Sequence, residues 1–366
     1  MAGQFSAGIK NIKRKEDQMD MIEKFTRRMP KVELHVHLEG SVRPQTLLKL
    51  AKRHNVALPA DDLEGLRKWY TFRDFGHFID IYMTISGCLR TARDIELIAR
   101  EFLMGQAEQN IVYSEVTFTP YNQYVTNQLG FREQLDAVNR ARTWAEKELG
   151  VRMGIIMDIP RHIRPEEGET IADWAIEGYG DGVIAFGLGG PETGNPPEKF
   201  QTAFDKVKRA GIPCILHAGE VEGPHSIWSA LRVADSQRIG HGVRAIEDPE
   251  LVAYLRERQV PLEVCPTSNI CLKVFPSLAA HSLPRLMEEG LYITINSDDP
   301  PMFNTTLTNE YIVGRENFGW GQDTIEQLIL NAVNVTLLPK NEREIMCREF
   351  KAAFERLKAE SKSEQP

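Results

Sequence analysis

The chain contains eight short apolar runs separated by stretches with helical periodicity, and this alternation constrains the fold more than any other feature of the sequence. Strands that alternate with helices through short connections form parallel βαβ units, and eight such units favour a closed barrel. The expected strands are residues 31–37, 112–118, 151–158, 183–189, 213–217, 238–240, 261–265 and 291–296. The sequence therefore predicts an α/β fold, a (β/α)8 TIM barrel.

The expected elements fit one domain with additions at both ends. We predict a single barrel domain over 29–358, preceded by an N-terminal extension over 1–28 and followed by a polar tail over 359–366. Apolar residues recur at helical spacing in 15–29, so a short amphipathic helix is expected there. Residues 41–108 are helical in pattern and form an insertion after the first strand, and further helices are expected after the last strand.

An apolar stripe lies within this insertion. Its members are Phe72, Phe75, Phe78, Ile79 and Tyr82. Such a stripe is typical of a helix that faces the core. Insertions at the ends of barrel strands also cover binding sites, so the stripe could instead roof an apolar pocket.

Composition excludes several classes of partner. The net charge of −8 argues against a nucleic acid or an anionic membrane surface as partner. No stretch approaches the roughly 20 apolar residues of a membrane span, and the N-terminal region lacks the apolar segment of a secretory signal. The five cysteines form no Cys-x-x-Cys pair, which favours free thiols in a reducing compartment. A cytoplasmic protein is expected; the sequence does not indicate its oligomeric state.

Two histidines close the first expected strand. His35 and His37 are two positions apart, so both side chains point to the same face of the strand. In a barrel strand that face is the interior, where two neighbouring imidazoles are difficult to satisfy in apolar surroundings. A lone inward histidine is more often a hydrogen-bonded core residue, whereas a pair at a strand end favours a metal site. Polar groups gathered at the carboxyl ends of barrel strands are typical of a TIM-barrel active site.

Two more candidate ligands follow other strands. His217 ends the fifth expected strand and Asp298 follows the eighth. Three histidines and one carboxylate suit zinc or a similar borderline ion, and zinc-bound water loses a proton near neutral pH. Barrel hydrolases with two metals often carry a lysine at the end of strand four, but that strand ends in glycines here. One ion is therefore expected.

Two further residues are candidates for proton transfer. Glu220 lies three residues beyond His217, and in a dry pocket its carboxyl would have a raised pKa and could act as an acid. A carboxylate near the start of the next helix is the alternative. His241 lies between two glycines at the end of the sixth strand, where it could orient the metal-bound water or take its proton. It could also be a fourth ligand or a core histidine.

The last candidates flank the expected metal site. Asp299 is adjacent to Asp298, so one carboxylate could bind metal while the other binds water or substrate. Gly190 ends the fourth expected strand without a side chain, which would let a flat ligand lie against the backbone. An ordinary turn is the alternative for this glycine.

These residues lie in motifs that resemble those of the adenosine deaminase family, including its adenine deaminase and aminodeoxyfutalosine deaminase relatives. The matching motifs are Glu-Leu-His-Val-His-Leu-Glu-Gly at 33–40, Leu-Gly-Gly-Pro-Glu at 188–192, His-Ala-Gly-Glu at 217–220, Arg-Ile-Gly-His-Gly at 238–242 and Asn-Ser-Asp-Asp-Pro at 296–300. They follow the family's order along most of the chain, and together they are far more specific than any single match.

The resemblance assigns a role to each candidate. It implies one Zn²⁺ per chain, with the ligands His35, His37, His217 and Asp298. It implies that Glu220 protonates N1 of a purine and that His241 and Asp299 position the attacking water, with Asp299 also near N7. It implies four substrate-binding residues: His37, Glu39, Gly190, whose amide would donate to N3, and Asp299. The implied reaction is hydrolytic deamination of a 6-aminopurine nucleoside.

Departures from the family pattern concern the substrate. Adenosine deaminases usually have Asp where this chain has Glu39, and Arg where it has Thr117. Adenine deaminases tend to carry Asp at the positions of Gly190 and Gly240, and the glycines here leave room for a sugar. Adenosine is the preferred prediction, yielding inosine and ammonia. Aminodeoxyfutalosine, a nucleoside with a larger 5′ group, is the first alternative and adenine the second. Arg161 could pair with a substrate carboxylate or lie on the surface.

Two other classes of function compete with this prediction. The first is a different barrel hydrolase, such as an amidase or phosphoesterase, which the presence of Glu220 and the absence of a strand-four lysine oppose. The second is a non-catalytic nucleoside-binding relative that keeps the fold without the chemistry. All the matched catalytic positions are occupied, which opposes the second class as well.

Overall fold

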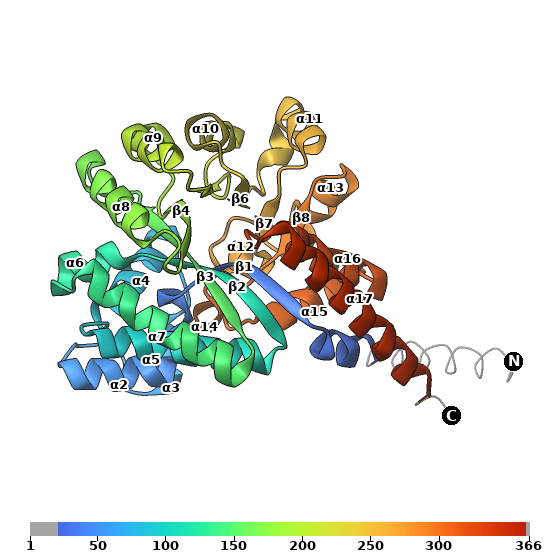
Figure 1. Ribbon diagram of the computed structural model, residues 1–366, viewed down its shortest axis with the longest axis horizontal. Helices are drawn as coiled ribbons and strands as arrows, with labels where there is room; N and C mark the ends of the chain where they lie inside the picture. Colours follow the sequence, from blue (N-terminus) through green and yellow to red (C-terminus); the bar gives the residue numbers. More distant parts are fainter. Residues whose placement is uncertain (1–20, 364–366) are drawn as a thin grey trace, which may run out of the picture.

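The computed structural model describes residues 21–363, and their strands form one eight-stranded sheet in which every neighbouring pair is parallel. The strands follow one another in sequence order around the sheet, with helices outside them (Figure 1). They are β1 (Lys31–His37), β2 (Ile111–Phe118), β3 (Arg152–Pro160), β4 (Val183–Gly189), β5 (Cys214–Ala218), β6 (Arg238–His241), β7 (Leu262–Val264) and β8 (Ile293–Ile295). The predicted (β/α)8 barrel is confirmed.

The seam between β8 and β1 is held partly by a side chain. Oδ1 of Asn296 accepts hydrogen bonds from the backbone N–H groups of Leu34 at 3.0 Å and His35 at 3.1 Å. Just beyond, the backbone N–H of Asp298 donates to the carbonyl oxygen of His35 at 3.0 Å. Asn296 therefore replaces part of the ladder between these two strands and brings Asp298 next to His35.

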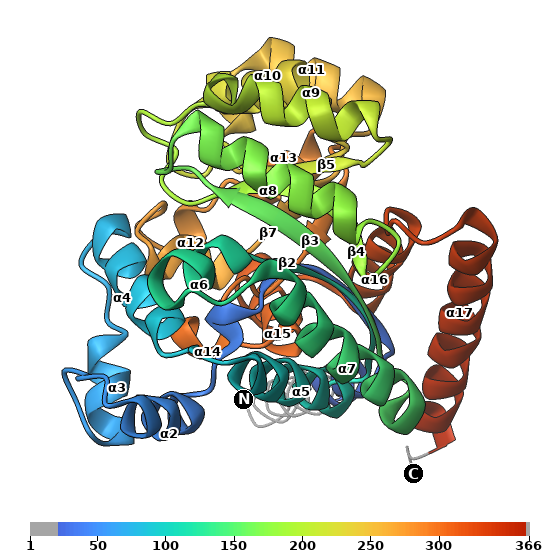
Figure 2. The ribbon, with the colours of Figure 1, turned by 60° about the vertical axis from the view of Figure 1, so that its left-hand side comes forward.

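The predicted helical insertion after β1 is also confirmed, and it lies at one side of the barrel (Figure 2). It consists of η1 (Glu39–Ser41), α2 (Pro44–His54), α3 (Leu63–Trp69), α4 (Phe75–Gly87) and α5 (Ala92–Glu108). A capping box begins α5, in which Thr91 and Asp94 satisfy each other's backbone N–H groups. Ala, Leu, Glu and Arg dominate α5, and these residues favour helix.

The remaining helices separate the strands and end the chain. Between the strands lie α6 (Pro120–Asn127), α7 (Phe131–Leu149), α8 (Pro165–Gly178), η2 (Pro197–Phe200), α9 (Gln201–Arg209), α10 (Pro224–Ala234), η3 (Ala245–Glu247), α11 (Pro249–Arg258), α12 (Pro266–Cys271), η4 (Leu278–Ala280) and α13 (Leu283–Glu288). After β8 come α14 (Pro300–Phe303), α15 (Leu307–Phe318), α16 (Gln322–Asn334) and α17 (Lys340–Ser363). Within the described part of the chain, no helix is long and apolar enough to cross a membrane.

Proline starts two short helices, each of which begins soon after a barrel strand ends. Pro266 begins α12 soon after β7, and Pro300 begins α14 soon after β8. Proline is well suited to the first helical position because its φ is already helical and its missing N–H would have no helical partner there. The chain therefore turns immediately at the strand ends, which keeps Asp298 and Asp299 at the rim of the barrel.

The two ends of the described chain lie close together. Residues 21–28 are helical, and Arg28 Nη2 lies 2.6 Å from Glu360 Oε2. The part of the predicted amphipathic helix before residue 21 and most of the predicted extension lie outside the described residues. Helix α17 continues to Ser363, past the predicted start of the polar tail at 359. Lys358 supports this last turn by pairing with Glu326 at 2.9 Å, a contact that the local composition did not reveal.

The interior of the barrel is charged rather than purely apolar. Arg238 on β6 donates to Glu115 on β2 at 2.5 Å and to Glu263 on β7 at 2.6 Å, and all three side chains are buried. Because β2 and β6 are not neighbours in the sheet, the Arg238–Glu115 contact must cross the barrel interior. Paired charges tolerate such burial, whereas an unpaired one would not. This network lies beneath the site described next.

Candidate active site

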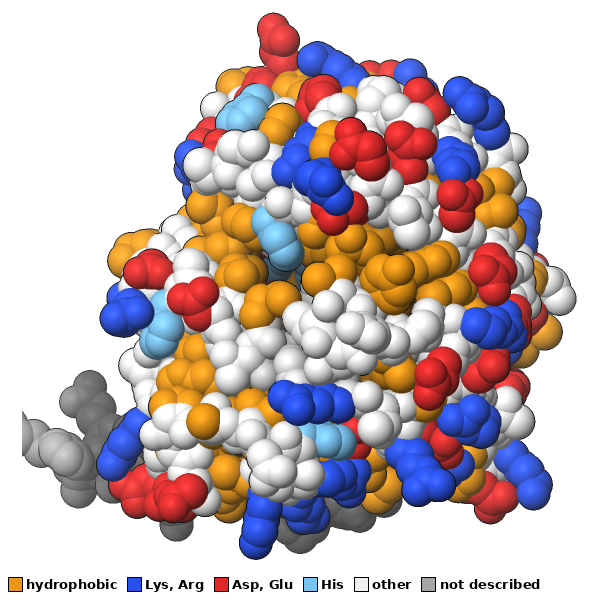
Figure 3. Space-filling view, turned by 90° about the vertical axis from the view of Figure 1, so that its left-hand side faces the viewer, with side chains coloured by type: hydrophobic (Ala, Val, Ile, Leu, Met, Phe, Trp, Pro, Cys, Tyr) orange, Lys and Arg blue, Asp and Glu red, His pale blue; other side chains and the backbone are white. Residues whose placement is uncertain are grey.

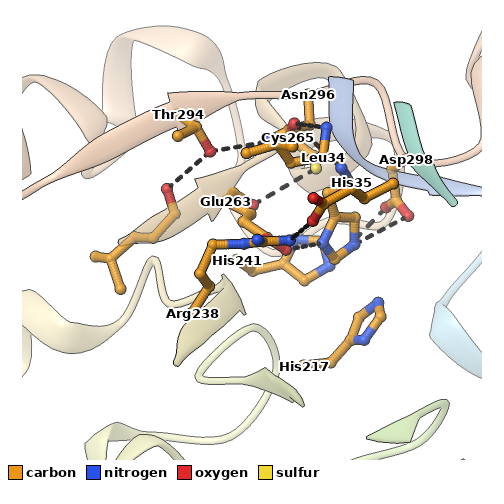
Figure 4. A network of polar contacts seen from close by, with 12 residues as sticks. Leu34, His35, His217, Arg238, His241, Glu263, Cys265, Thr294, Asn296 and Asp298 are labelled. Carbon is orange, nitrogen blue, oxygen red and sulfur yellow. Dashed lines mark hydrogen bonds and ion pairs between the residues drawn. The ribbon is translucent and has the colours of Figure 1, made fainter. Parts of the chain in front are cut away.

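Four of the predicted residues form a compact cluster at the end of the barrel. His37 Nε2 lies 3.1 Å from His217 Nε2 and 3.3 Å from Asp298 Oδ1, and His35 Nε2 lies 3.6 Å from the same oxygen. One ligand atom from each of the four side chains falls within 4.8 Å of all the others. Figure 4 shows His35, His217 and Asp298 converging from different strands. The structure thus brings together the residues predicted as metal ligands.

Hydrogen bonds fix which nitrogen two of these rings present to the cluster. His35 Nδ1 donates to Glu263 Oε2 at 2.9 Å, and His217 Nδ1 donates to the carbonyl oxygen of Leu188 at 3.2 Å. Both Nε2 atoms therefore carry lone pairs in the neutral rings. Among the described residues, His35 Nε2 is buried without a hydrogen-bond partner. Lone pairs that converge on one point, with a carboxylate beside them, fit a cation.

The residues that support this cluster were not predicted from sequence. Glu263 orients His35 and is itself held by Arg238. Burial alone would raise the pKa of Glu263, but the Arg238 guanidinium and His35 keep it below its ordinary value. The available signal was weak: Arg238 begins the expected strand 238–240, and Glu263 lies in the middle of the expected strand 261–265.

The two adjacent aspartates both reach the site, but their surroundings differ. Asp298 accepts a hydrogen bond from Ser268 Oγ at 2.6 Å, and its contacts with His35 and His37 outweigh burial and hold its pKa well below the usual range. Burial and the neighbouring Asp298 charge raise the pKa of Asp299 well above the usual range. One carboxylate is thus charged, and the other is disposed to hold a proton.

Gly40 makes room for Asp299. A Cβ atom at position 40 would lie only 1.5 Å from Asp299 Oδ1. Any other residue there would displace this carboxyl from the site. The glycine in the motif after β1 is therefore required by the position of Asp299, a link between two distant segments that the sequence alone did not show.

Glu220 and His241 face each other beside the cluster of candidate metal ligands. Glu220 Oε2 lies 3.7 Å from His241 Nε2, and both residues are nearly fully buried. Burial, followed by the charges of Asp298 and Glu192, raises the pKa of Glu220 well above its ordinary value. Its Oε1 has no hydrogen-bond partner within the described chain. This carboxyl can therefore carry a proton at neutral pH and offer it to a ligand.

A second buried carboxylate holds the loop that carries Glu220. The Glu192 oxygens accept hydrogen bonds from the backbone N–H groups of Gly219 at 2.8 Å, Glu220 at 3.0 Å, Val221 at 2.7 Å and Glu222 at 2.9 Å, and from Ser226 Oγ at 2.6 Å. These five bonds satisfy buried and partly buried donors of the loop. The sequence presented Glu192 only as part of a motif, without a role.

These residues line one pocket. Its wall consists of His37, Phe75, Phe78, Ile79, Tyr82, Met83, Thr119, Asn122, Asp158, Pro160, His162, Gly189, Gly190, Pro191, His217, Glu220, His241, Leu272, Asp298 and Asp299. Figure 3 shows a hollowed face where hydrophobic side chains surround a histidine. Helix α4 supplies the apolar side of the pocket, so the predicted stripe does roof it. Phe72 instead packs against Phe78 and Phe303.

Gly190 and Gly240 have different reasons to lack a side chain. Gly190 lines the pocket with φ of 91°, and a Cβ there would meet nothing closer than 3.7 Å. Gly240 is not part of the pocket wall. A Cβ at position 240 would come within 2.7 Å of His35 Cε1, so this glycine makes room for the ring of a candidate ligand rather than for a sugar.

Glu39, predicted to contact the substrate, lies behind the pocket wall. It is fully buried, its Oε1 accepts from the backbone N–H of Thr119 at 3.0 Å, and its Oε2 accepts from Tyr82 Oη at 3.3 Å. Burial raises the pKa of Glu39 to about 7. Asp158, by contrast, is part of the wall, and it accepts from Thr119 Oγ1 at 2.5 Å. The sequence reasoning missed Asp158, although its position at the end of β3 was a signal.

Arg161 fits neither prediction made for it. It is fully buried, and its guanidinium donates to the carbonyl oxygens of Asn195 and His217. It therefore lies neither on the surface nor free to bind a substrate carboxylate. An arginine that donates to the backbone carbonyl of the candidate ligand His217 stabilises the end of β5, a role that only the tertiary contacts reveal.

The comparisons with known proteins agree with this geometry. Residues 30–353 match the adenosine deaminase family. An aminodeoxyfutalosine deaminase from Streptomyces coelicolor is 40% identical over 314 residues, covering 85% of this chain and 80% of the relative. An adenine deaminase from Stutzerimonas stutzeri is 38% identical over 309 residues, covering 84% of this chain and 97% of the relative.

Solved structures give the same result for the fold. The adenine deaminase from Arthrobacter aurescens superposes with a TM-score of 0.85 at 29% identity, covering 88% of this chain and 98% of that one. A zinc-bound amidohydrolase from Burkholderia ambifaria superposes with a TM-score of 0.87 at 24% identity, covering 93% and 95%. The chain belongs to the adenosine deaminase family of hydrolases, which deaminate purines.

Proposed function

We propose that the protein is a zinc-dependent deaminase of a 6-aminopurine nucleoside with an extended 5′ group, of which aminodeoxyfutalosine is an example. Adenosine, the first choice from sequence, becomes the second candidate, because the similar relatives are named for aminodeoxyfutalosine and adenine. The observation that carries the proposal is the composition of the pocket wall, which combines proton-transfer residues with polar side chains of Thr119, Asn122 and Asp158 and with the apolar face of α4.

The donor set supports one zinc ion. The residues that would hold it are His35, His37, His217 and Asp298. The chemistry that zinc supplies in such a site is activation of water, whose pKa falls to about 7. A second group of donors consists of His241, Cys265 and Asp298. Burial raises the pKa of Cys265 well above its ordinary value, and the shared Asp298 cannot serve two separate ions fully.

The proton-transfer residues suit attack at C6 of a purine. Glu220 has a raised pKa and a free oxygen facing the pocket, so it can deliver a proton to N1 of the ring. Asp299 and His241 flank the same space and can hold the attacking water in line with C6. Protonation of N1 turns C6 into a better electrophile, and the water oxygen forms the new C6–O bond. The two protons of this water balance the reaction: one replaces the proton that Glu220 gave to N1, and the other reaches the amino group before the C6–N bond breaks and ammonia leaves. Water and the aminopurine thus give a 6-oxopurine and ammonia.

The polar part of the pocket wall supports a nucleoside rather than a free base. Asp158, Thr119 and Asn122 place polar groups on this wall, where a sugar hydroxyl can donate to Asp158. Free adenine would leave these groups without a partner, and unpaired buried polar groups disfavour binding. The apolar face of α4 lines the same pocket and can contact a 5′ substituent larger than the hydroxyl of adenosine.

Ammonia release measured on aminodeoxyfutalosine, adenosine, deoxyadenosine and adenine tests this ranking. We expect the highest kcat/KM on the 5′-extended nucleoside and the lowest on adenine. The variant Asp158→Asn keeps the shape of the side chain but weakens acceptance from a sugar hydroxyl. It should lower kcat/KM on nucleosides and leave that on adenine nearly unchanged. Equal or better turnover of adenine by the parent protein would make it an adenine deaminase instead.

A further inference from the structure

His241 is the last member of a chain of hydrogen bonds that starts outside the pocket. Its Nδ1 lies 3.3 Å from Nδ2 of Asn269, and Asn269 Oδ1 lies 3.1 Å from Nε2 of His281. The backbone N–H of Leu283 lies 3.0 Å from Nδ1 of His281. Asn269 is in α12 after β7, and both it and His281 are buried. Neither residue lines the pocket.

The backbone N–H of Leu283 fixes the direction of every hydrogen bond in this series. A backbone N–H can only donate, so Nδ1 of His281 must accept and carries no proton. The proton of the neutral His281 ring is then on Nε2, which donates to Asn269 Oδ1. Burial supports the neutral form, because it lowers the pKa of His281 to about 4. The Asn269 amide nitrogen must therefore face His241.

The same logic sets the proton of His241. Asn269 Nδ2 can only donate, so Nδ1 of His241 accepts and the proton of the neutral ring is on Nε2. This Nε2 lies 3.7 Å from Glu220 Oε2 and 3.9 Å from Asp298 Oδ2, so its N–H points into the catalytic space. In the opposite tautomer, Nδ1–H and the Asn269 amide would be two donors facing each other inside the protein, which is costly.

We propose that Asn269 and His281 are positioning residues that hold His241 with its proton on Nε2. His241 then donates a hydrogen bond to the oxygen that attacks the ring, and it does not take the proton of that oxygen. The inference rests on the proposed function of the site. It chooses among the roles that the sequence left open for His241, and it assigns a purpose to two buried polar side chains outside the pocket.

Nitrogen NMR of the zinc-loaded protein with ¹⁵N-labelled histidine tests the proposal directly. A His241→Gln variant identifies the signals of this ring. We expect a bare Nδ1 and a protonated Nε2 on His241, and the same pattern on His281. A proton on Nδ1 of His241, or an Nε2 of His241 bound to the metal, would overturn the proposal. This measurement requires no turnover, so its result does not depend on which substrate the protein uses.

The variant Asn269→Asp supplies the functional test. Its carboxylate still accepts from His281 but cannot donate to His241, so Nδ1 of His241 should gain a proton. Loss of a positioned donor to the reacting oxygen typically costs about 10²–10³ in kcat. We expect a fall of that order in kcat, a small change in KM, and a full complement of zinc. An Asn269→Asp protein that shows the new Nδ1 proton but keeps the parent's kcat would contradict the proposal.

A second pair of variants separates the role of the His281 donor from a general loss of folding. His281→Gln can still donate an amide N–H to Asn269 Oδ1, so it should retain kcat within about tenfold of the parent and preserve the His241 NMR pattern. His281→Leu has a similar size but removes the donor, so the Asn269 amide is free to turn. It should populate both tautomers of His241. Identical His241 spectra in the two variants, with both proteins folded, would show that His281 has no such role.

Discussion

Nδ1 of His35 donates a hydrogen bond to Oε2 of Glu263 at 2.9 Å, and Oε1 of Glu263 accepts from Nε of Arg238 at 2.6 Å. The candidate metal ligand is thus connected to the buried ion pairs in the barrel interior (Figure 4). A carboxylate behind a ligating histidine fixes the orientation of the ring and makes its other nitrogen a stronger donor. The electrostatic network of the barrel therefore contributes to the candidate metal site above it.

The first prediction concerns metal content. Purified protein should contain about one zinc per chain, because three histidines and one aspartate form a single donor set. Elemental analysis after extensive dialysis measures this directly. Prolonged treatment with a strong chelator should abolish deaminase activity, and added zinc should restore it. Two tightly held ions per chain, or activity in demonstrably metal-free protein, would contradict the single-site assignment.

The second prediction concerns the support of that site. Glu263→Gln removes the charge that orients His35 while keeping the size of the side chain. Loss of such a partner typically weakens metal binding about 10–100-fold. Competition with a chromophoric chelator measures the change in zinc affinity. Thermal melting checks that the protein still folds when Arg238 has lost one of its two charged partners. Unchanged zinc affinity in a folded Glu263→Gln protein would show that the ring needs no such support.

The third prediction concerns proton delivery. Glu220→Gln preserves shape but cannot transfer a proton to N1. Removal of a positioned acid usually costs about 10²–10⁴ in rate. We expect kcat to fall by that amount or more, with zinc content unchanged because Glu220 is not one of the clustered ligands. If the variant works within tenfold of the parent, the proton comes from another group.

The fourth prediction concerns Glu39, which acts on the pocket through its neighbours. Glu39→Asp shortens the side chain and draws it away from the Thr119 N–H, so Thr119 and its partner Asp158 should shift. Misplacement by about 1 Å can cost about 10²-fold. We expect kcat/KM on nucleosides to fall while adenine turnover and zinc content change little. A Glu39→Asp, Asp158→Asn double variant should then have the same kcat/KM on nucleosides as Asp158→Asn alone. Additive losses in kcat/KM would show that the two residues act independently.

The fifth prediction concerns pH and stability at Glu310. This carboxyl is buried in α15, where it accepts from the Thr267 N–H at 3.0 Å and from Thr305 Oγ1. Burial raises its pKa from 4.5 to about 7. A raised pKa means that the folded state binds the proton more tightly than the unfolded state. Its contribution to stability is therefore complete below pH 4.5 and is lost as the pH rises through about 7.

The variant Glu310→Gln isolates this contribution. The amide can still accept from Thr267, and Thr305 can accept from the amide N–H, so the fold should be retained. Thermal melting of both proteins at pH 5 and pH 8 should show the parent losing stability relative to the variant at the higher pH. Other titrating groups affect both proteins equally. A difference in Tm that does not change with pH would show that Glu310 stays charged throughout.

Local patterns were sufficient for the fold and for the identity of the clustered residues. Apolar runs that alternate with helical segments can bury their surfaces only as parallel βαβ units, so the barrel follows from periodicity. His35 and His37 share a strand face by geometry, and strand ends in a barrel meet at one rim. His217 and Asp298 could therefore be placed beside them without a structure.

The tertiary structure decided what depends on contacts between distant segments. Glu39 and Asp158 are both carboxylates at strand ends, but only packing shows that Glu39 lies behind the wall while Asp158 forms part of it. Gly240 accommodates His35, and Glu263 orients it, through contacts across the barrel. The tautomer of His241 depends on a backbone N–H more than forty positions away in the sequence. Sequence patterns report the face on which a side chain lies, whereas its partners, burial and protonation are properties of the folded chain.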